Sequence, residues 1–141
     1  MEGELKNRAR EYFRGVYGGK PEVVDVLAAK DIVSTYPIFE NLFKTPALQG
    51  RTAVKDFAIG FSQRWDNAQI TFHEAIAEGS QVVLLWSFRA RRVETNEEHS
   101  WGGITYFRFD GSGKIVAEIG EESTPGPVER WAPEHAPQSF S

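Results

Sequence analysis

The spacing of apolar residues changes near residue 68, and this change limits the possible folds more than any other feature of the sequence. Before it, apolar residues recur every three to four positions, as in helices. After it, apolar and polar residues alternate, as in strands with one buried face. Helices followed by a run of strands predict an α+β fold, in which the helices cover one face of an antiparallel sheet.

The first half of the chain is predicted to hold three helices. Gly18 and Gly19 end the first helix, and Pro21 suits the first turn of the second. Thr52 is a candidate N-cap for the third helix. The predicted elements of this half are helices over 4–17, 21–29 and 53–65, a short strand over 31–36 and a packed loop over 36–50.

The second half is predicted to form a four-stranded antiparallel meander, over 69–77, 81–94, 99–109 and 115–123. Turn residues at 78–80 and 110–113 join the strands. Long strands curl, so this sheet beneath three helices would enclose a cone-shaped space. We expect one domain over 1–124, followed by a proline-containing tail over 125–141 without regular structure.

Composition excludes several classes of function. The 141 residues include no cysteine, which removes disulfides and thiolate chemistry. A net charge of −4 argues against nucleic-acid binding, and no apolar run approaches the about 20 residues of a membrane span. The charged N-terminus argues against a signal peptide, so we expect a cytoplasmic protein. Three scattered histidines have no metal-ligand spacing, so no metal is expected. The glycine pairs at 18–19 and 102–103 do not fit a nucleotide-binding motif, so no other cofactor is expected.

The order of elements resembles the nuclear transport factor 2-like superfamily, in particular its SnoaL-like and ketosteroid isomerase-like members. The local matches are Tyr17-Gly18-Gly19 at the end of the first helix, the segment 50–54 that opens the third, and the hairpin 107–120. The resemblance covers about residues 5–124. It implies a cone-shaped α+β barrel with a ligand pocket, although this fold carries many functions.

The catalytic sets of these relatives do not carry over. Ketosteroid isomerases use a tyrosine on the first helix, an aspartate base before a proline and a protonated aspartate on a late strand. Tyr12 matches the tyrosine, but Tyr36 and Thr105 stand at the two acidic positions. SnoaL-like cyclases use a histidine and an aspartate on the last strand, where this chain has Glu118 and Gly120. The Asp-Arg-Asp set of limonene epoxide hydrolases has no match.

The last strand has two possible inner faces. Alternation alone buries Ile115, Ala117 and Ile119, whereas the resemblance turns Glu118 and Glu122 toward the pocket. Both patterns hold if a second copy of the chain covers the outer face of the sheet. We therefore expect a homodimer with these glutamates directed inward.

Four residues are the catalytic candidates. Glu118 is the first, because a carboxylate in an apolar cavity has a raised pKa, which suits acid–base work near neutral pH. Glu122 is a second carboxylate, and His99, expected near the pocket rim, is a third titrating group. Tyr12 would donate a hydrogen bond to a substrate oxygen. Each residue also has a plain structural interpretation, as an exposed strand or rim residue or a core tyrosine.

The remaining candidates would bind the substrate. They are Tyr36, Phe57, Phe61, Trp86, Phe88, Trp101 and Thr105. Aromatic residues in such stripes are common in ordinary cores, so they add little on their own.

Two hypotheses follow. The first is a cofactor-independent acid–base enzyme, an isomerase, cyclase or dehydratase (lyase-type), acting on a small apolar oxygenated molecule such as a polyketide-, terpenoid- or steroid-like compound. The alternative is a non-catalytic module of the same fold that binds a small ligand or serves dimerisation.

Overall fold

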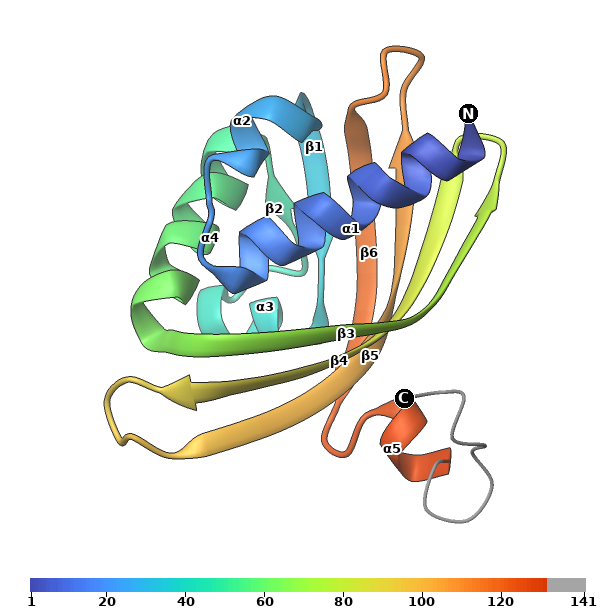
Figure 1. The fold of residues 1–141 in the computed structure, drawn as a ribbon. Helices are drawn as coiled ribbons and strands as arrows, with labels where there is room; N and C mark the ends of the chain where they lie inside the picture. Colours follow the sequence, from blue (N-terminus) through green and yellow to red (C-terminus); the bar gives the residue numbers. More distant parts are fainter. Residues whose placement is uncertain (132–141) are drawn as a thin grey trace.

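The structure, a computed structural model, describes residues 1–131, which form four helices in the N-terminal half, six strands and a short last helix. The helices are α1 (Glu2–Gly18), α2 (Val23–Leu27), α3 (Pro37–Phe43), α4 (Arg51–Arg64) and α5 (Pro127–Trp131). The strands are β1 (Ala28–Thr35), β2 (Leu48–Gln49), β3 (Trp65–Glu78), β4 (Gln81–Arg92), β5 (Glu98–Phe109) and β6 (Ile115–Ser123). Figure 1 shows α1 crossing one face of a curved sheet, with α4 beside it.

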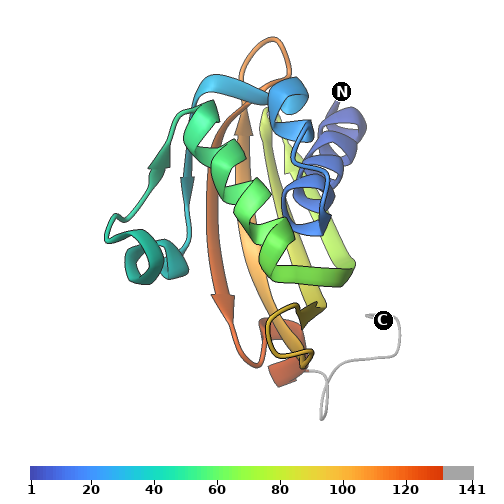
Figure 2. The same ribbon diagram turned by 90° about the vertical axis from the view of Figure 1, so that its left-hand side faces the viewer.

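The six strands form one open sheet in the order β2-β1-β6-β5-β4-β3. All neighbours are antiparallel except β1 and β6, which run parallel and place Ser34 beside Glu118. The long strands bend around the helices, and helices α1, α2 and α4 lie on the inner, concave face (Figure 2). This arrangement confirms the predicted α+β cone.

Three local predictions differ from the structure. The segment predicted as a packed loop contains α3 and β2, because Pro37 starts a helix at its first position, where no amide hydrogen is needed. Helix α2 ends at Leu27, and the chain continues directly into β1. The tail, predicted to lack regular structure, forms α5 before the described residues end; 132–141 lie outside them.

A β-bulge settles which residues of β6 face inward. Arg108 pairs with Ala117 but Phe109 pairs with Ile115, so β6 carries one extra residue there. Ile115 and Glu118 are therefore both fully buried on the inner face. Of the residues that alternation alone would bury, Ile115 is buried, whereas Ile119, beyond the bulge, is 51% exposed on the outer face.

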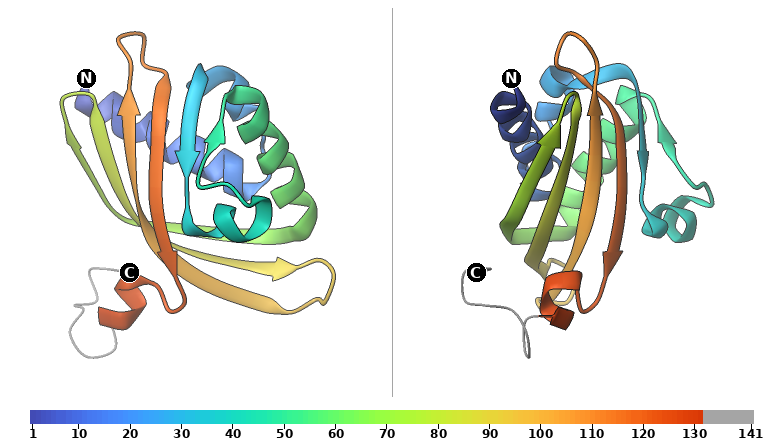
Figure 3. Two further views of the ribbon diagram at one scale, coloured as in Figure 1. Left: turned by 180° about the vertical axis from the view of Figure 1, so that it is seen from behind. Right: turned by 90° about the vertical axis from the view of Figure 1, so that its right-hand side faces the viewer.

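The core lies between α1 and the sheet. The buried side chains of α1 recur at helical spacing, and they are Leu5, Ala9, Tyr12, Phe13 and Val16. Seen from behind, the outer face of the sheet is free of helices α1–α4, and α5 lies at one end of it (Figure 3). No helix in the described part of the chain is both long and apolar enough to span a membrane.

Candidate active site

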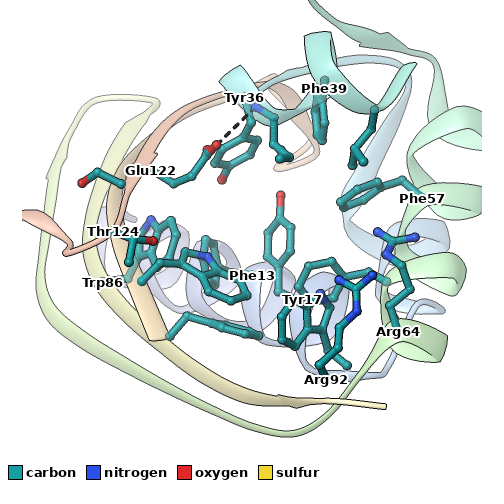
Figure 4. A pocket seen from close by; sticks show the side chains of 17 residues that line it. Phe13, Tyr17, Tyr36, Phe39, Phe57, Arg64, Trp86, Arg92, Glu122 and Thr124 are labelled. Carbon is teal, nitrogen blue, oxygen red and sulfur yellow. Dashed lines mark hydrogen bonds between the residues drawn. The ribbon is translucent and has the colours of Figure 1, made fainter. Parts of the chain in front are cut away.

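A cavity of about 470 Å³ opens between the helices and the concave face of the sheet (Figure 4). Its walls are mostly aromatic, with a few polar side chains among them. The lining residues are Phe13, Tyr17, Tyr36, Ile38, Phe39, Leu42, Phe57, Phe61, Arg64, Trp65, Trp86, Phe88, Arg92, Trp101, Glu122, Ser123 and Thr124. A concave, largely apolar pocket with a few polar groups is typical of small-molecule sites.

A fully buried carboxylate lies directly behind this wall. Glu118 Oε2 accepts hydrogen bonds from the hydroxyls of Tyr17 and Tyr36, each at 2.8 Å. Its Oε1 accepts a bond of 2.9 Å from Ser34 Oγ. Glu118 does not line the cavity itself, so the two tyrosines stand between its carboxylate and a bound molecule.

Thr105 extends this arrangement to the indole of Trp86. Trp86 Nε1 donates to Thr105 Oγ1 at 2.9 Å, and Thr105 Oγ1 lies 2.8 Å from the hydroxyl of Tyr36. Because Thr105 Oγ1 accepts from the indole, its own proton is free to go to Tyr36, whose proton goes to Glu118. We call Ser34, Tyr17, Tyr36, Thr105 and Glu118 the hydroxyl cluster.

Burial controls the ionisation of this cluster. It raises the pKa of Glu118, while the hydrogen bonds from Tyr17, Tyr36 and Ser34 act in the opposite direction. Burial and the neighbouring carboxylate raise the pKa values of Tyr17 and Tyr36 well above the usual range. The tyrosines therefore remain protonated donors, and Glu118 is the member of the cluster that gains or loses a proton most readily.

Local sequence explains the positions of Glu118 and Tyr36. Ser34 meets Glu118 through the parallel pairing of β1 with β6. Tyr36 precedes Pro37, which holds it in an extended conformation and turns the chain into α3. Its ring lies over Gly120, where any Cβ would overlap the ring atoms. The glycine at this position thus makes room for a tyrosine rather than for a second acid.

Glu122 is the carboxylate that borders the cavity directly. Its Oε1 accepts a bond of 3.2 Å from the amide of Ile38, drawn as a dashed line in Figure 4. Its Oε2 is buried and has no hydrogen-bond partner among residues 1–131. Burial raises the pKa of Glu122, and the neighbouring Glu121 adds to that effect.

The aromatic substrate-binding candidates Phe57, Phe61, Trp86, Phe88 and Trp101 all line the cavity. Phe88 and Trp101 stack with their ring centroids 4.5 Å apart. Tyr36 also lines it, whereas Thr105 is buried behind it. The cavity wall therefore brings together most of the residues selected from the strand pattern.

Tyr12 and His99 lie away from the cavity wall. Tyr12 is fully buried against Phe107, and its hydroxyl has no hydrogen-bond partner within the described residues. The side chain of His99 is 48% exposed, 3.9 Å from Glu97, and its ring packs edge-on against Trp65. Neither residue is placed to touch a molecule in the cavity.

Sequence reasoning missed two features of the site. The sequence points to Tyr12 as the hydrogen-bond donor, whereas Tyr17, five residues further along α1, is the tyrosine of this helix that reaches Glu118. The second feature is a pair of arginines, Arg64 and Arg92, at the cavity wall. Their positions at the last residues of α4 and β4 were visible only once those elements were placed in space.

Residues 1–131 hold no group of three or more histidine, aspartate or glutamate side chains placed to bind a metal ion. The polar groups of this chain at the cavity wall are carboxyl, phenol, guanidinium, indole and aliphatic hydroxyl groups.

Solved structures of several proteins resemble this fold. One, designated a SnoaL-like polyketide cyclase from Jannaschia sp. CCS1, has 12% identity and a TM-score of 0.72 over 96% of this chain and 95% of that chain. An LEH-like epoxide hydrolase from M. tuberculosis has 12% identity and a TM-score of 0.70 over 87% and 85%. An NTF2-like protein from Burkholderia pseudomallei has 18% identity and a TM-score of 0.70 over 90% and 94%. At such identities the likeness establishes the fold alone.

Sequence comparison gives a more specific result. A search of curated proteins finds no match to this chain. The model of the SnoaL-like domain family, in contrast, matches residues 9–118, from the second half of α1 to Glu118 in β6. With the fold and the cavity already in agreement, the chain belongs to the SnoaL-like domain family.

Proposed function

We propose that this protein is a cofactor-independent acid–base enzyme that isomerises, cyclises or dehydrates a small, largely apolar, oxygenated molecule in the cavity. One observation carries the proposal: two tyrosine hydroxyls at the cavity wall both donate to the same oxygen of a buried glutamate with a raised pKa. Similar folds that bear the designations cyclase and epoxide hydrolase support an enzymatic role.

In the proposed mechanism, Glu118 supplies a proton through a tyrosine. When Glu118 is protonated, it donates to the oxygen of Tyr17 or Tyr36, and the hydroxyl of that tyrosine turns toward the cavity. A substrate oxygen there receives a hydrogen bond or the proton itself. Donors already positioned in a dry site stabilise negative charge as it develops on that oxygen.

Glu122 is proposed as the partner base. Its unpartnered Oε2 and raised pKa suit removal of a proton from a carbon next to the activated oxygen. Glu118 and Glu122 are four residues apart on β6, about 13 Å between Cα atoms. The ring of Tyr36 lies over Gly120 between them, so the substrate is proposed to lie between the hydroxyl of Tyr36 and Glu122. Return of the proton at another carbon would complete an isomerisation.

The proposal is tested by hydrogen–deuterium exchange. A panel of apolar ketones, including β,γ-unsaturated cyclohexenones, is incubated with the protein in deuterium oxide and followed by NMR. We expect catalysed exchange next to the carbonyl, and a loss of about 100-fold or more in Glu118→Gln, since general acid–base catalysis contributes about 10²–10⁴-fold. Tyr17→Phe should lose part of the rate.

Glu74→Gln is the control, because Glu74 is exposed on β3 of the same sheet and does not line the cavity. It should exchange at the wild-type rate. An equal rate in Glu118→Gln and wild type would contradict the role of Glu118.

The non-catalytic module is the second candidate, and one observation favours it. Both oxygens of Glu118 are fully hydrogen-bonded and do not reach the cavity, as in a structural network. If the protein is a non-catalytic module, it should catalyse no hydrogen–deuterium exchange with any ketone. Glu118→Gln should then bind ligands with affinities within a few-fold of wild type.

We further propose a homodimer formed through the outer face of the sheet. Val33, Ile104 and Ile119 lie on the neighbouring strands β1, β5 and β6, and they are 37%, 46% and 51% exposed. Sedimentation at micromolar concentration should give a dimer, and Ile119→Glu should shift it toward monomer. A monomeric wild type would contradict this proposal without affecting the cavity.

A further inference from the structure

Two arginines meet at one side of the cavity because of backbone pairing. Arg64 is the last residue of α4 and Arg92 the last of β4. Trp65, which follows Arg64, pairs with Arg92 in the sheet. The amide of Val93 also donates to the carbonyl of Arg64 at 2.9 Å. These bonds hold the two side chains next to each other at the cavity wall.

In the part of the chain that the structure describes, neither guanidinium has an anionic partner. Within residues 1–131, Arg64 and Arg92 form no ion pair and no side-chain hydrogen bond, whereas their neighbours do. Arg91, which points to the outer face, holds Asp66 through two bonds of 2.8 and 2.6 Å. Arg89, also outward, bonds to Gln69 at 3.0 Å. Along this strand, the inward arginine is thus the one without a polar partner.

Aromatic rings of the cavity hold the two arginines in place. Arg64 lies 5.9 Å from the ring centroids of both Phe57 and Phe61, and Arg92 lies 5.1 Å from that of Trp65. Burial lowers the pKa of Arg64, and the positive charge of Arg92 adds to the effect. Two like charges in one wall repel each other, and no carboxylate of the described chain offsets this repulsion.

We propose that Arg64 and Arg92 bind a carboxylate of the substrate, so that the molecule in the cavity is an apolar oxygenated acid. A guanidinium presents paired donors that match a carboxylate, and two guanidiniums provide both charge and geometry. This inference rests on the proposed function only in using the cavity as a substrate site.

The opposite wall fixes the direction of binding. Figure 4 places Glu122 and Thr124 across the cavity from Arg64 and Arg92. An acid would be repelled by Glu122, so its carboxylate lies at the arginines. Its neutral oxygen and the carbons beside it then lie toward Tyr17, Tyr36 and Glu122, where proton transfer is proposed.

The test compares three ligands of one shape by titration calorimetry. They are 1-naphthaleneacetic acid, its amide and 2-(1-naphthyl)ethylamine, which carry negative, zero and positive charge. We expect the acid to bind about tenfold more tightly than the amide, and the amine to bind most weakly, which corresponds to about 1.4 kcal/mol between acid and amide. The double variant Arg64→Gln/Arg92→Gln should bind acid and amide equally.

Two controls isolate the arginines. Arg89→Gln removes an outward charge from the same strand and should keep the preference for the acid. In wild type, raising the salt concentration from about 0.02 to about 0.3 M should weaken binding of the acid but not of the amide, because salt screens charge. This second measurement does not depend on the variants folding.

Several results would overturn the inference. They are equal affinities for acid and amide in wild type, a preference that survives in the double variant, or no binding of the acid at millimolar concentration. Glu118→Gln should retain the preference. If the protein prefers the acid but catalyses no proton exchange, the proposed reaction alone is contradicted. If it catalyses exchange but does not prefer the acid, this inference alone is contradicted.

Discussion

The hydroxyl cluster, which borders the cavity through Tyr17 and Tyr36, and the arginine pair at the same cavity differ in how their polar groups are satisfied. Every oxygen of Glu118 has a hydrogen-bond partner within the chain. Arg64 and Arg92 have aromatic neighbours but no anion in the described residues. The two arginines are only half-buried, so an unpaired guanidinium there weakens folding little, and its charge stays available to a ligand. The cluster is thus complete in the folded chain, whereas the arginine pair is completed by a ligand.

This difference leads to different costs of mutation. Removing a member of the hydroxyl cluster leaves buried partners unsatisfied, so it should damage folding as well as function. Removing an arginine leaves no orphaned partner, so it should damage binding alone. The predictions below measure this contrast by the free energy of unfolding.

The largest effect is expected for Glu118→Ala. It leaves the hydroxyls of Tyr17 and Ser34 without acceptors and opens a void, so the free energy of unfolding should fall by about 2–4 kcal/mol, since each buried unsatisfied group costs about 1–3 kcal/mol. Urea denaturation measures the change. Glu118→Gln keeps the size and one acceptor oxygen for the tyrosines, and Ser34 Oγ can turn to accept from the new amide, so the variant should lose less than about 1 kcal/mol. Equal losses in the two variants would mean that the amide of Gln does not replace the carboxylate, so that the retained volume alone does not stabilise the fold.

Gly120→Ala is expected to have the next largest effect. A Cβ there overlaps the ring of Tyr36, which must move away from Glu118. Forcing an extra methyl group into a packed site costs about 1–3 kcal/mol. Denaturation and a crystal structure of the variant would measure the loss and the displacement. Unchanged stability would show that Tyr36 is not held over Gly120, and would weaken the proposed path of the proton.

The contrast also explains what could be predicted from the sequence. The spacing of apolar residues and the turn-forming residues located β3–β6, α1 and α4, because local sequence patterns determine these elements. Alternation placed Trp86, Phe88 and Trp101 on the inner face. The contact between Ser34 and Glu118 depends on the parallel pairing of β1 and β6, which no local pattern reveals.

The missed residues have similar causes. Tyr12 and Tyr17 both lie on the buried side of α1, and only the position of β6 decides which of them reaches Glu118. A β-bulge of one residue brought Ile115 and Glu118 to the same face, against strict alternation. Arg64 and Arg92 are 28 positions apart in the printed sequence and meet only through pairing of strand ends.

A smaller effect is expected from pH. The pKa of folded Glu118 lies above its ordinary value of 4.5, because burial disfavours the charge. The folded protein therefore keeps a proton that the unfolded chain releases, so stability falls as pH rises from about 4.5 through the folded pKa. Wild type should lose stability relative to Glu118→Gln over this range, measured by urea denaturation between pH 4.5 and 7.5. A relative gain would mean that the three donors hold Glu118 ionised.

The smallest effect on folding is expected at the arginine pair, where Arg64→Gln and Arg92→Gln should each change the free energy of unfolding by less than about 0.5 kcal/mol, as surface substitutions do. Neither change orphans a partner, and each relieves repulsion between like charges, which offsets the lost contact with an aromatic ring. Denaturation of both single variants and the double variant measures this. A loss of stability comparable to that of Glu118→Ala would show that the arginines stabilise the folded chain. The two regions would then not differ, and the argument that the arginines are kept for a ligand would be wrong.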